Sequence, residues 1–388
     1  MSTVRLGDIC QFINGGAWTQ SEFSDSGYPV LKVSNCKPSG FLIDDVSYIP
    51  LDIAEKSEIN KLHIHDVIIA TVGSHPNLVD SAAGRSCIVT EKVRGYYLNQ
   101  NAVCLRTLGD NILNQRYLGF LTQYFPFQHY IQNKGKGAAN QMRIAISAIK
   151  DYTFELPEIR IQNRVANILS AYDDLIENNQ KQIKLLEEAA QRLYKEWFVD
   201  LHFPRYENTP IIDGIPQGWR KISLGDIAPI LTGKKDANFG TEDGVYPFFT
   251  CSQEPIKAPS YSFDTSAVIL AGNGDFNVKL YRGKFEAYQR TYVLSPNEEK
   301  YLYLLYNAVN ESMAVLVKGA SGSTIKFLTK GMIESIPLFI PTDDLLTQYN
   351  NYSEAVQRKL ECLRKAIKNA TEARDRLLPK LMSGELEV

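Results

Sequence analysis

The stretch Ile161–Trp197, IQNRVANILSAYDDLIENNQKQIKLLEEAAQRLYKEW, decides the fold of this 388-residue chain. Apolar residues recur along it every three or four positions, and neither Gly nor Pro interrupts it. This spacing is typical of an amphipathic helix with a coiled-coil seam. A helix of about 36 residues would be roughly 54 Å long, which is longer than a small domain is wide.

A second stretch with the same spacing begins at Tyr349 and continues to Pro379. A polar seam residue such as Asn179 can fix the register of two paired helices. The alternative is two amphipathic helices that each pack only on their own domain. The positions expected at a helix–helix interface are Val165, Tyr172, Asn179, Ile183, Leu186, Leu193, Val356, Leu360, Leu363, Ile367 and Leu377.

The chain is a duplicated module. Arg5–Ile9 (RLGDI) recurs as Ser223–Ile227 (SLGDI), and residues 133–157 align with residues 317–341 at a constant offset of 184. A long helix-favouring stretch follows each aligned segment. The predicted order is a globular domain (1–157), a long spacer helix (158–200), a linker (201–216), a second globular domain (217–341) and a second long spacer helix (342–388).

Each globular half mixes short β-rich runs with helical ones, so the fold class is α+β. Val67–Ala70 and Ala267–Leu270 are rich in β-branched residues and are predicted to be buried strands. His63 and His65 alternate along what we interpret as a strand, and aromatic-rich helices are expected at about 112–132 and 298–315. If the halves are equivalent in space, a pseudo-two-fold axis relates them, and the two long helices run antiparallel as a coiled-coil rod.

Composition excludes several classes of protein. No apolar run is long enough to cross a membrane, and no signal peptide is recognisable, so we expect a cytoplasmic protein. The six cysteines are scattered without a C-x-x-C pair, which indicates buried reduced thiols and no metal site. We find neither a P-loop nor a glycine-rich cofactor loop, so the chain itself is expected to be non-catalytic and to bind no cofactor.

The net charge is −2, but the charges are unevenly distributed. No acidic residue lies between Asp110 and Asp151 or between Glu311 and Glu334, and these two stretches are equivalent in the repeat. Both contain glycine-rich loops with basic, amide and hydroxyl side chains, which can bind phosphates and base edges. One such loop alone would more simply be a solvated surface loop, but two in register indicate DNA contact.

Gln100-Asn101 and Gln289-Arg290-Thr291 form a second pair of equivalent sites. Gln and Asn can pair with adenine, and Arg with guanine, so differing side chains on one scaffold suit two different half-sites. The simpler alternative is ordinary polar residues at a strand edge. The predicted DNA contacts are Gln100, Asn101, Arg116, Lys134, Lys136, Asn140, Gln141, Arg143, Gln289, Arg290, Thr291, Lys318, Ser321, Ser323, Thr324 and Lys326.

The order of these motifs resembles the specificity subunit of type I restriction–modification systems. Leu6–Ile9, and Gly218-Trp219 followed by Leu224–Ile227, are similar to the openings of target-recognition domains in that family. Leu193–Asp200 and Leu377–Glu385 are similar to the ends of its spacer helices. The first half lacks the Gly-Trp that precedes the motif in the second half.

The resemblance implies that each globular domain reads one half of a split, asymmetric DNA target. It further implies that the helices set the gap and dock two methyltransferase subunits, which restriction subunits then join. S-adenosylmethionine, ATP and Mg²⁺ are expected in those partner subunits, with adenine N6 as the methylated atom.

Two rival functions remain open. A coiled-coil adaptor without DNA specificity would suit the near-neutral charge, although it would not explain the acid-free loops. A free-standing DNA-binding regulator would bind DNA tightly without a partner.

Overall fold

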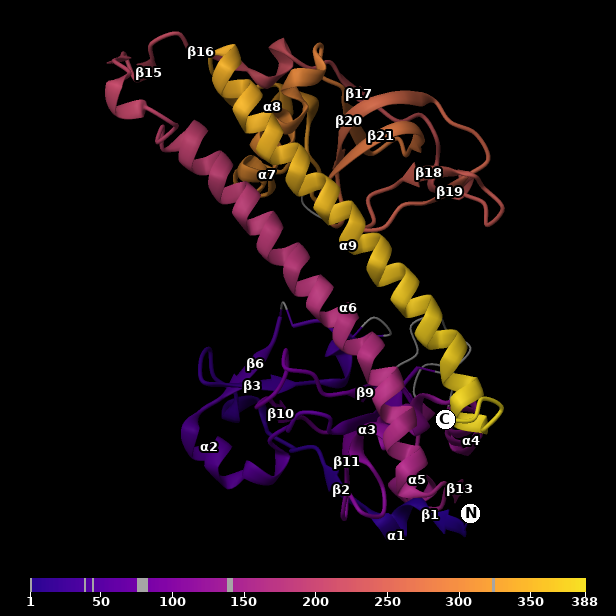
Figure 1. Ribbon diagram of the computed structural model, residues 1–388. Coiled ribbons are helices and arrows are strands. Elements are labelled where there is room, and N and C mark those ends of the chain that lie inside the picture. Colours follow the sequence, from indigo (N-terminus) through magenta and orange to yellow (C-terminus); the bar gives the residue numbers. More distant parts are fainter. Residues whose placement is uncertain (1, 38–39, 44, 75–82, 138–141, 323–324) are drawn as a thin grey trace. The chain divides into compact units, whose positions relative to one another are not determined.

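The computed structural model describes residues 2–37, 40–43, 45–74, 83–137, 142–322 and 325–388, and it places them in two compact units (Figure 1). Unit 1 comprises Met1–Asn178 and Ile367–Val388, and unit 2 comprises Asn179–Ala366. Each unit combines helices with sheets, which confirms the mixed helix-and-sheet class expected from the sequence.

A four-stranded antiparallel sheet, in the order β2-β11-β7-β9, lies at the centre of unit 1. Successive side chains of a strand point to opposite faces, and both faces of this sheet are covered. Val67 and Ile69 pack against α3, whereas Ile68 packs on the other face beside Cys87. This explains why every residue of β7 is buried. The bounds are β2 Cys10–Asn14, β7 Val67–Ala70, β9 Ser86–Ile88, β11 Ala102–Thr107 and α3 Gln115–Gln123.

Smaller sheets surround this centre, among them β10-β3-β6 and the antiparallel pairs β1-β13, β12-β8 and β4-β5. The remaining bounds in unit 1 are β1 Ser2–Arg5, α1 Leu6–Ile9, β3 Tyr28–Leu31, β4 Cys36–Lys37, β5 Gly40–Phe41, β6 Ser47–Ile49, α2 Leu51–Lys56, β8 Val72–Gly73, β10 Tyr97–Leu98, α4 Phe125–Lys134, β12 Met142–Arg143, α5 Ile146–Lys150 and β13 Thr153–Leu156.

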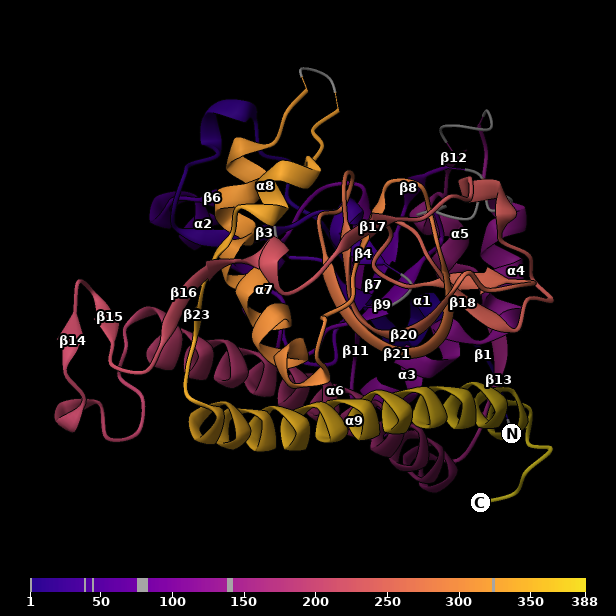
Figure 2. The same ribbon diagram turned by 90° about the horizontal axis from the view of Figure 1, so that it is seen from above.

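Unit 2 contains a six-stranded sheet in the order β17-β22-β20-β21-β18-β19 (Figures 1 and 2). Only β18 and β21 pair in parallel among its described strands. Val268 and Leu270 pack in the core shared with α7, and Ile269 packs on the opposite face with Phe285. The bounds are β14 Ile211–Ile212, β15 Ile215–Pro216, β16 Arg220–Ser223, β17 Ile230–Thr232, β18 Tyr246–Phe249, β19 Ile256–Ala258, β20 Phe263–Ala271, β21 Val278–Ala287, β22 Thr291–Leu294, α7 Leu302–Gly319, α8 Lys330–Glu334 and β23 Pro337–Ile340.

The repeated Leu-Gly-Asp-Ile segments occupy similar local settings in the two units. Each follows a strand that pairs antiparallel with the strand ahead of a long helix: β1 with β13 in unit 1, and β16 with β23 in unit 2. Gly7 and Gly225 each approach the helix that precedes this last strand, because a Cβ there would lie 2.9 Å from Lys150 Cβ or 3.2 Å from Glu334 Cβ.

The two long helices are α6 (Ile159–Tyr194), which ends in a π-turn at Lys195–Val199, and α9 (Asp343–Ser383). In unit 2 they contact each other in antiparallel order, since Glu187 pairs with Arg364 at 2.8 Å and Trp197 packs on Tyr349. In unit 1, Asp173 pairs with Arg374. Both helices therefore contribute to the packing of both units.

No predicted interface position on these helices is exposed. Asn179 is 5% exposed, and its Nδ2 has no hydrogen-bond partner among the described residues. Val165, Leu360 and Leu363 are buried, and the half-buried positions are Tyr172, Ile183, Leu186, Leu193, Val356, Ile367 and Leu377.

Several local predictions were wrong. His63 and His65 lie in a turn, in which His65 has φ 67°, and not in a strand. The helix expected at about 112–132 is broken into α3 and α4, because Pro126 begins a new helix. Pro379 does not end α9, which continues for one more turn.

The linker contains a hairpin, and two of the cysteines differ from expectation. Asp213 and Gly214, both with positive φ, form the turn of the β14-β15 hairpin inside the linker. Cys251 is half-buried and Cys362 is exposed, whereas the other four cysteines are buried as expected. None of the helices in the described part of the chain is long and apolar enough to cross a membrane.

Candidate nucleic-acid interface

Gln100 and Asn101 are exposed at a tight turn immediately before β11. The chain can close here because Gly15 has no side chain: a Cβ at that position would lie 1.9 Å from the carbonyl oxygen of Asn99. Asn101 has φ 72°, a left-handed conformation that Asn tolerates better than most residues. The two amide side chains are thus presented by a constrained backbone.

Backbone hydrogen bonds connect this turn to the acid-free loop of unit 1. The N–H of Thr71, which follows β7, donates to the carbonyl of Asn101 at 2.8 Å, and the N–H of Ile144 donates to the carbonyl of Thr71 at 2.8 Å. Lys136 and Arg143 exchange two backbone hydrogen bonds of 2.9 Å at the base of the loop. We call Gln100, Asn101, Lys136 and Arg143 the unit 1 loop site.

Unit 2 repeats the same hydrogen-bond pattern. The N–H of Gly272 donates to the carbonyl of Arg290 at 2.8 Å, and the N–H of Leu328 donates to the carbonyl of Gly272 at 2.8 Å. Ser321 and Phe327 exchange backbone hydrogen bonds of 3.0 and 2.8 Å at the base of the second loop. We call Gln289, Arg290, Ser321, Lys326 and Phe327 the unit 2 loop site.

A glycine also lies close to the backbone just before the polar turn of unit 2. A Cβ on Gly233 would lie 1.9 Å from the carbonyl oxygen of Ala287, as Gly15 approaches Asn99 in unit 1. In each unit, therefore, one scaffold brings a polar turn against the base of an acid-free loop. The side chains that the two scaffolds present are different.

Several cations of the two loop sites have no partner in the described part of the chain. The exposed side chains of Lys136, Arg143, Arg290 and Lys326 form no ion pair or hydrogen bond with a described residue. The same holds for Lys318 at the end of α7. Cations without a protein partner can bind phosphate groups without first losing an ion pair.

Other predicted contacts are partly engaged within the protein. The Gln289 amide donates to Asp236 Oδ1 at 2.6 Å, and the Lys134 ammonium lies 5.4 Å from the ring centroid of Tyr130. Ser321 is exposed. The predicted contacts Asn140, Gln141, Ser323 and Thr324 lie outside the described residues.

Two predicted contacts are not brought to the loop sites. Thr291 is fully buried, because β22 turns its side chain to the face opposite Tyr292, so its hydroxyl does not offer a surface contact. Arg116 donates to His65 Nε2 at 3.1 Å and lies 3.9 Å from Asp174. His65 precedes β7, whereas the loop site lies beyond the other end of that strand.

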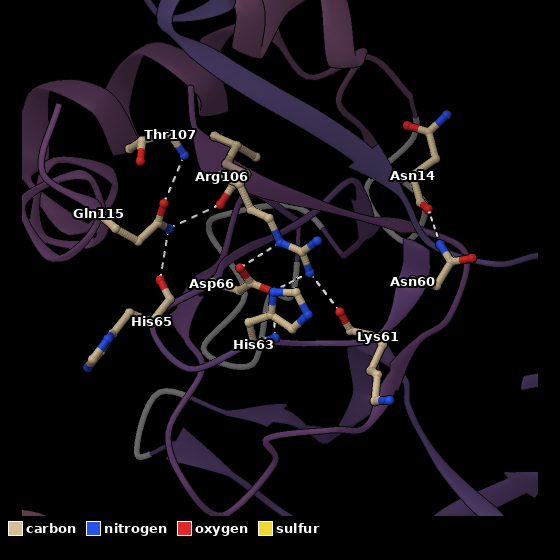
Figure 3. A network of polar contacts seen from close by, with 10 residues as sticks. Asn14, Asn60, Lys61, His63, His65, Asp66, Arg106, Thr107 and Gln115 are labelled. Atoms are coloured by element: carbon tan, nitrogen blue, oxygen red, sulfur yellow. Dashed lines mark hydrogen bonds and ion pairs between the residues drawn. The ribbon is translucent and has the colours of Figure 1, made fainter. Parts of the chain in front are cut away.

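A polar network stabilises the turn that precedes β7 (Figure 3). The guanidinium of Arg106 donates to both oxygens of the buried Asp66, at 2.8 and 2.7 Å, and to the carbonyl of Lys61 at 2.6 Å. The backbone N–H of His63 also donates to Asp66. The hydrogen bonds with Asp66 raise the pKa of Arg106. This network fixes the turn in which His65 adopts its left-handed conformation.

Gln115 adds a second tie to the same turn, since its amide donates to the carbonyl of His65 at 2.9 Å and accepts from the N–H of Thr107 at 2.8 Å (Figure 3). Burial and the nearby Arg116 lower the pKa of His65. No motif in the sequence indicated this network, because its hydrogen-bonded partners lie up to 50 residues apart.

A cavity of about 270 Å³ opens beside the unit 2 loop site. Gly272, Gln289, Arg290, Tyr292, Phe327 and Lys330 line it. The sequence indicated Gln289 and Arg290 but not the two aromatic residues. No group of three or more His, Cys, Asp or Glu side chains that could hold a metal ion occurs among the residues that the structure describes.

Several known proteins that are similar to this chain are type I restriction enzyme specificity subunits. The sequence model described as "Type I restriction modification DNA specificity domain" matches residues 1–188 and 216–348. The EcoDI type I restriction enzyme specificity subunit of Escherichia coli is 38% identical over 183 residues, which cover 44% of this chain and 39% of that protein. The putative MjaX specificity subunit of Methanocaldococcus jannaschii is 24% identical over 417 aligned positions, which cover 99% of this chain and 93% of that protein.

The S subunit of a type I restriction–modification system from M. genitalium has a similar fold. Its crystal structure aligns with a TM-score of 0.62 at 15% identity, over 98% of this chain and 95% of that one. The family resemblance drawn from the sequence motifs is confirmed by the family match, which takes in most of the chain. The chain thus belongs to the family of type I restriction–modification DNA specificity proteins.

Proposed function

We propose that this chain is the DNA-specificity subunit of a type I restriction–modification complex, in which each loop site reads one half of a split, asymmetric target. The observation that carries the proposal is the repeated hydrogen-bond pattern, which joins a polar turn to an acid-free loop in each unit. A shared scaffold with different side chains suits two different half-sites.

Within each site the residues divide by chemistry. Arg290, Gln100 and Asn101 carry planar groups that can form paired hydrogen bonds with base edges, and they read sequence. Lys136, Lys318 and Lys326 carry point charges, and they bind phosphates. Arg143 and Ser321 stand at the bases of the loops and can contact either group.

The long helices set the gap between the two half-sites. A helix of 36 residues spans about 54 Å, which corresponds to roughly 16 base pairs at about 3.4 Å each. Sites on one face of the duplex would favour centres about 10 base pairs apart. In this proposal a pseudo-two-fold axis also relates the two halves of the chain.

The partners are double-stranded DNA, two methyltransferase subunits and restriction subunits. Exposed apolar side chains on the long helices, Leu175, Leu185 and Tyr352, offer surface for the methyltransferase subunits. The chain itself is non-catalytic. S-adenosylmethionine, ATP and Mg²⁺ act in the partner subunits, where adenine N6 is methylated.

A mobility-shift titration at rising salt, with and without the methyltransferase subunit, tests this function. With a net charge of −2, the chain alone should bind DNA weakly, and the partner should strengthen binding. The affinity of the complex should fall steeply with salt, because phosphate contacts release counterions. Tight binding by the chain alone would favour the free-standing regulator, and no binding in either case would favour the adaptor.

A further inference from the structure

The cavity beside the unit 2 loop site is open to solvent and is held by three chain segments. Gly272 is hydrogen-bonded through its N–H to Arg290 and through its carbonyl to Leu328, each at 2.8 Å. The hydroxyl of Tyr292 donates to the carbonyl of Leu328, also at 2.8 Å. These bonds fix the walls, so a ligand entering the cavity would not have to order them.

Gly272 keeps this arrangement possible. A Cβ at this position would lie 2.5 Å from the carbonyl oxygen of Arg290 and 2.9 Å from the ring of Tyr292. Any larger residue would therefore push apart the segments that carry the aromatic and the basic side chains. The cavity therefore depends on the close approach of the Gly272 backbone to that of Arg290.

The lining combines aromatic surface with positive charge. Tyr292 is half-buried, with its ring held by the bond to Leu328, whereas Phe327 is 38% exposed. The side chain of Arg290 forms no ion pair or hydrogen bond with a described residue, and the ammonium of Lys330 pairs with Glu334 Oε1 at 3.4 Å. The Gln289 amide donates to Asp236, which leaves its carbonyl oxygen able to accept a hydrogen bond.

We propose that this cavity binds a single nucleobase together with its phosphate. The aromatic rings would stack on the base, Gln289 and Arg290 would meet its polar edges, and Lys330 would bind the phosphate. A cavity of about 270 Å³ is slightly smaller than the sites that hold drug-sized ligands, which suits one nucleotide. This inference rests on the proposed function, because it names the unit of DNA that the unit 2 loop site takes up.

The nucleotide could come from DNA or from solution. A base drawn from the duplex must lose its stacking and pairing, and stacking on aromatic side chains offsets a cost of similar size. A free nucleotide would avoid that cost. Both sources share the same chemistry in the cavity, so the experiment must separate them.

The test uses the full chain with its methyltransferase subunit and a cognate duplex carrying 2-aminopurine at one position at a time. If the base comes from DNA, the fluorescence of 2-aminopurine at one position should rise when the complex binds. Phe327→Ala should abolish that rise and weaken the affinity for the duplex about tenfold. Phe327→Tyr should keep both, whereas Phe327→Leu, which is apolar but not aromatic, should behave like Phe327→Ala. A signal at the methylated base that persists in all variants comes from the partner subunit.

The matched control is Phe125→Ala, which removes an exposed phenylalanine of unit 1 far from the cavity in sequence. It should leave the Phe327-dependent signal unchanged. In a parallel arm, saturation-transfer NMR measures binding of the four deoxynucleoside monophosphates to the full chain without DNA. Binding that Phe327→Ala abolishes, with no Phe327-dependent signal in DNA, would assign the cavity to a free nucleotide.

The proposal is overturned if neither arm gives a Phe327-dependent signal while the complex still binds its target selectively, in which case the proposed function stands. If the complex binds no DNA selectively, the proposed function fails. The NMR experiment with monophosphates still shows in that case whether the cavity binds a nucleotide, because it needs no DNA target.

Discussion

Arg374 and Asp173 are joined by a 2.7 Å ion pair within unit 1, although they are 201 residues apart in sequence. The pair links the last third of α9 to the first half of α6. Both side chains are about two-thirds or more buried, so the contact is better shielded from water than the surface ion pairs of the chain.

A double-mutant cycle with Asp173→Ala and Arg374→Ala should give a coupling free energy of about 1 kcal/mol, at the upper end for partly exposed pairs. The readout is hydrogen exchange of the β7 and β11 amides, which reports the stability of unit 1. The same cycle on the exposed pair Glu91 and Arg94 should give less than about 0.5 kcal/mol. Equal coupling in the two cycles would mean that the pair does not stabilise helix packing.

Glu354 on α9 is expected to make the stability of unit 2 depend on pH. Its carboxylate accepts hydrogen bonds from Tyr303, Arg282 and Arg358. Mainly the Tyr303 bond, and then the two arginines, lower the pKa of Glu354 below its usual 4.5, and burial opposes them only in part. A carboxyl with a lowered folded-state pKa stabilises the protein above about pH 4.5, and this contribution is lost as the pH falls through the folded-state pKa.

Glu354→Gln should therefore destabilise unit 2 by about 1–2 kcal/mol at pH 7, since bonds to a charged acceptor are lost. The loss should shrink as the pH falls through the folded-state pKa of Glu354, because the wild-type carboxyl then also becomes protonated. Thermal unfolding between pH 3 and 7, compared with Glu361→Gln at an exposed position of the same helix, measures both effects. A loss for Glu354→Gln that did not vary with pH would contradict the assignment.

Arg106→Met should destabilise unit 1 by about 3 kcal/mol, because it leaves the buried carboxylate of Asp66 without its cation. Arg94→Met removes an exposed cation of the same unit and should cost less than about 0.5 kcal/mol. Hydrogen exchange in the β7 and β11 amides would compare the two. A small effect of Arg106→Met would show that the network in Figure 3 does not stabilise the turn before β7.

Arg290→Ala should relax the choice of base at one position of the second half-site, since a guanidinium can pair bidentately with guanine. Lys136→Ala should weaken binding to all sequences by a similar factor and should lower the salt dependence, if Lys136 binds a phosphate as proposed. Target selection with each variant separates the two roles. The roles would be assigned wrongly if Lys136→Ala altered the selected sequence and Arg290→Ala did not.

Inserting one heptad into α6 and a matching heptad into α9 should lengthen the gap between half-sites by about 3 base pairs, since seven residues add about 10 Å. Duplication of Glu177–Ile183 together with Leu360–Ala366 keeps the apolar spacing. Both half-sites should stay the same. A gap that does not change would refute the role of the helices in setting it.

The sequence predicted those features that depend on spacing along the chain. The apolar repeat of Ile161–Trp197 predicted α6, and Val67–Ala70 predicted β7 to the residue. The offset between the halves predicted that the loops near Lys136 and Lys326 are equivalent, and their hydrogen bonds follow the same pattern.

Features that depend on register or on distant partners could not be predicted in this way. Thr291 lies beside Arg290 in sequence, but strand alternation directs its side chain into the core, and only the sheet pairing reveals which residue faces out. His65 lies in a turn because Asp66 pairs with Arg106, 40 residues away. The sequence does not indicate Phe327, because only the fold brings it into one cavity with Tyr292 and Arg290.

We propose that the two loop sites on one chain read the two halves of a split target. Selection from a random duplex library, with this chain and the methyltransferase encoded beside it, would measure this directly. We expect a two-part motif with a fixed unspecific gap, in which Arg290→Ala changes the second part alone. A single continuous motif, or no enrichment at all, would contradict it.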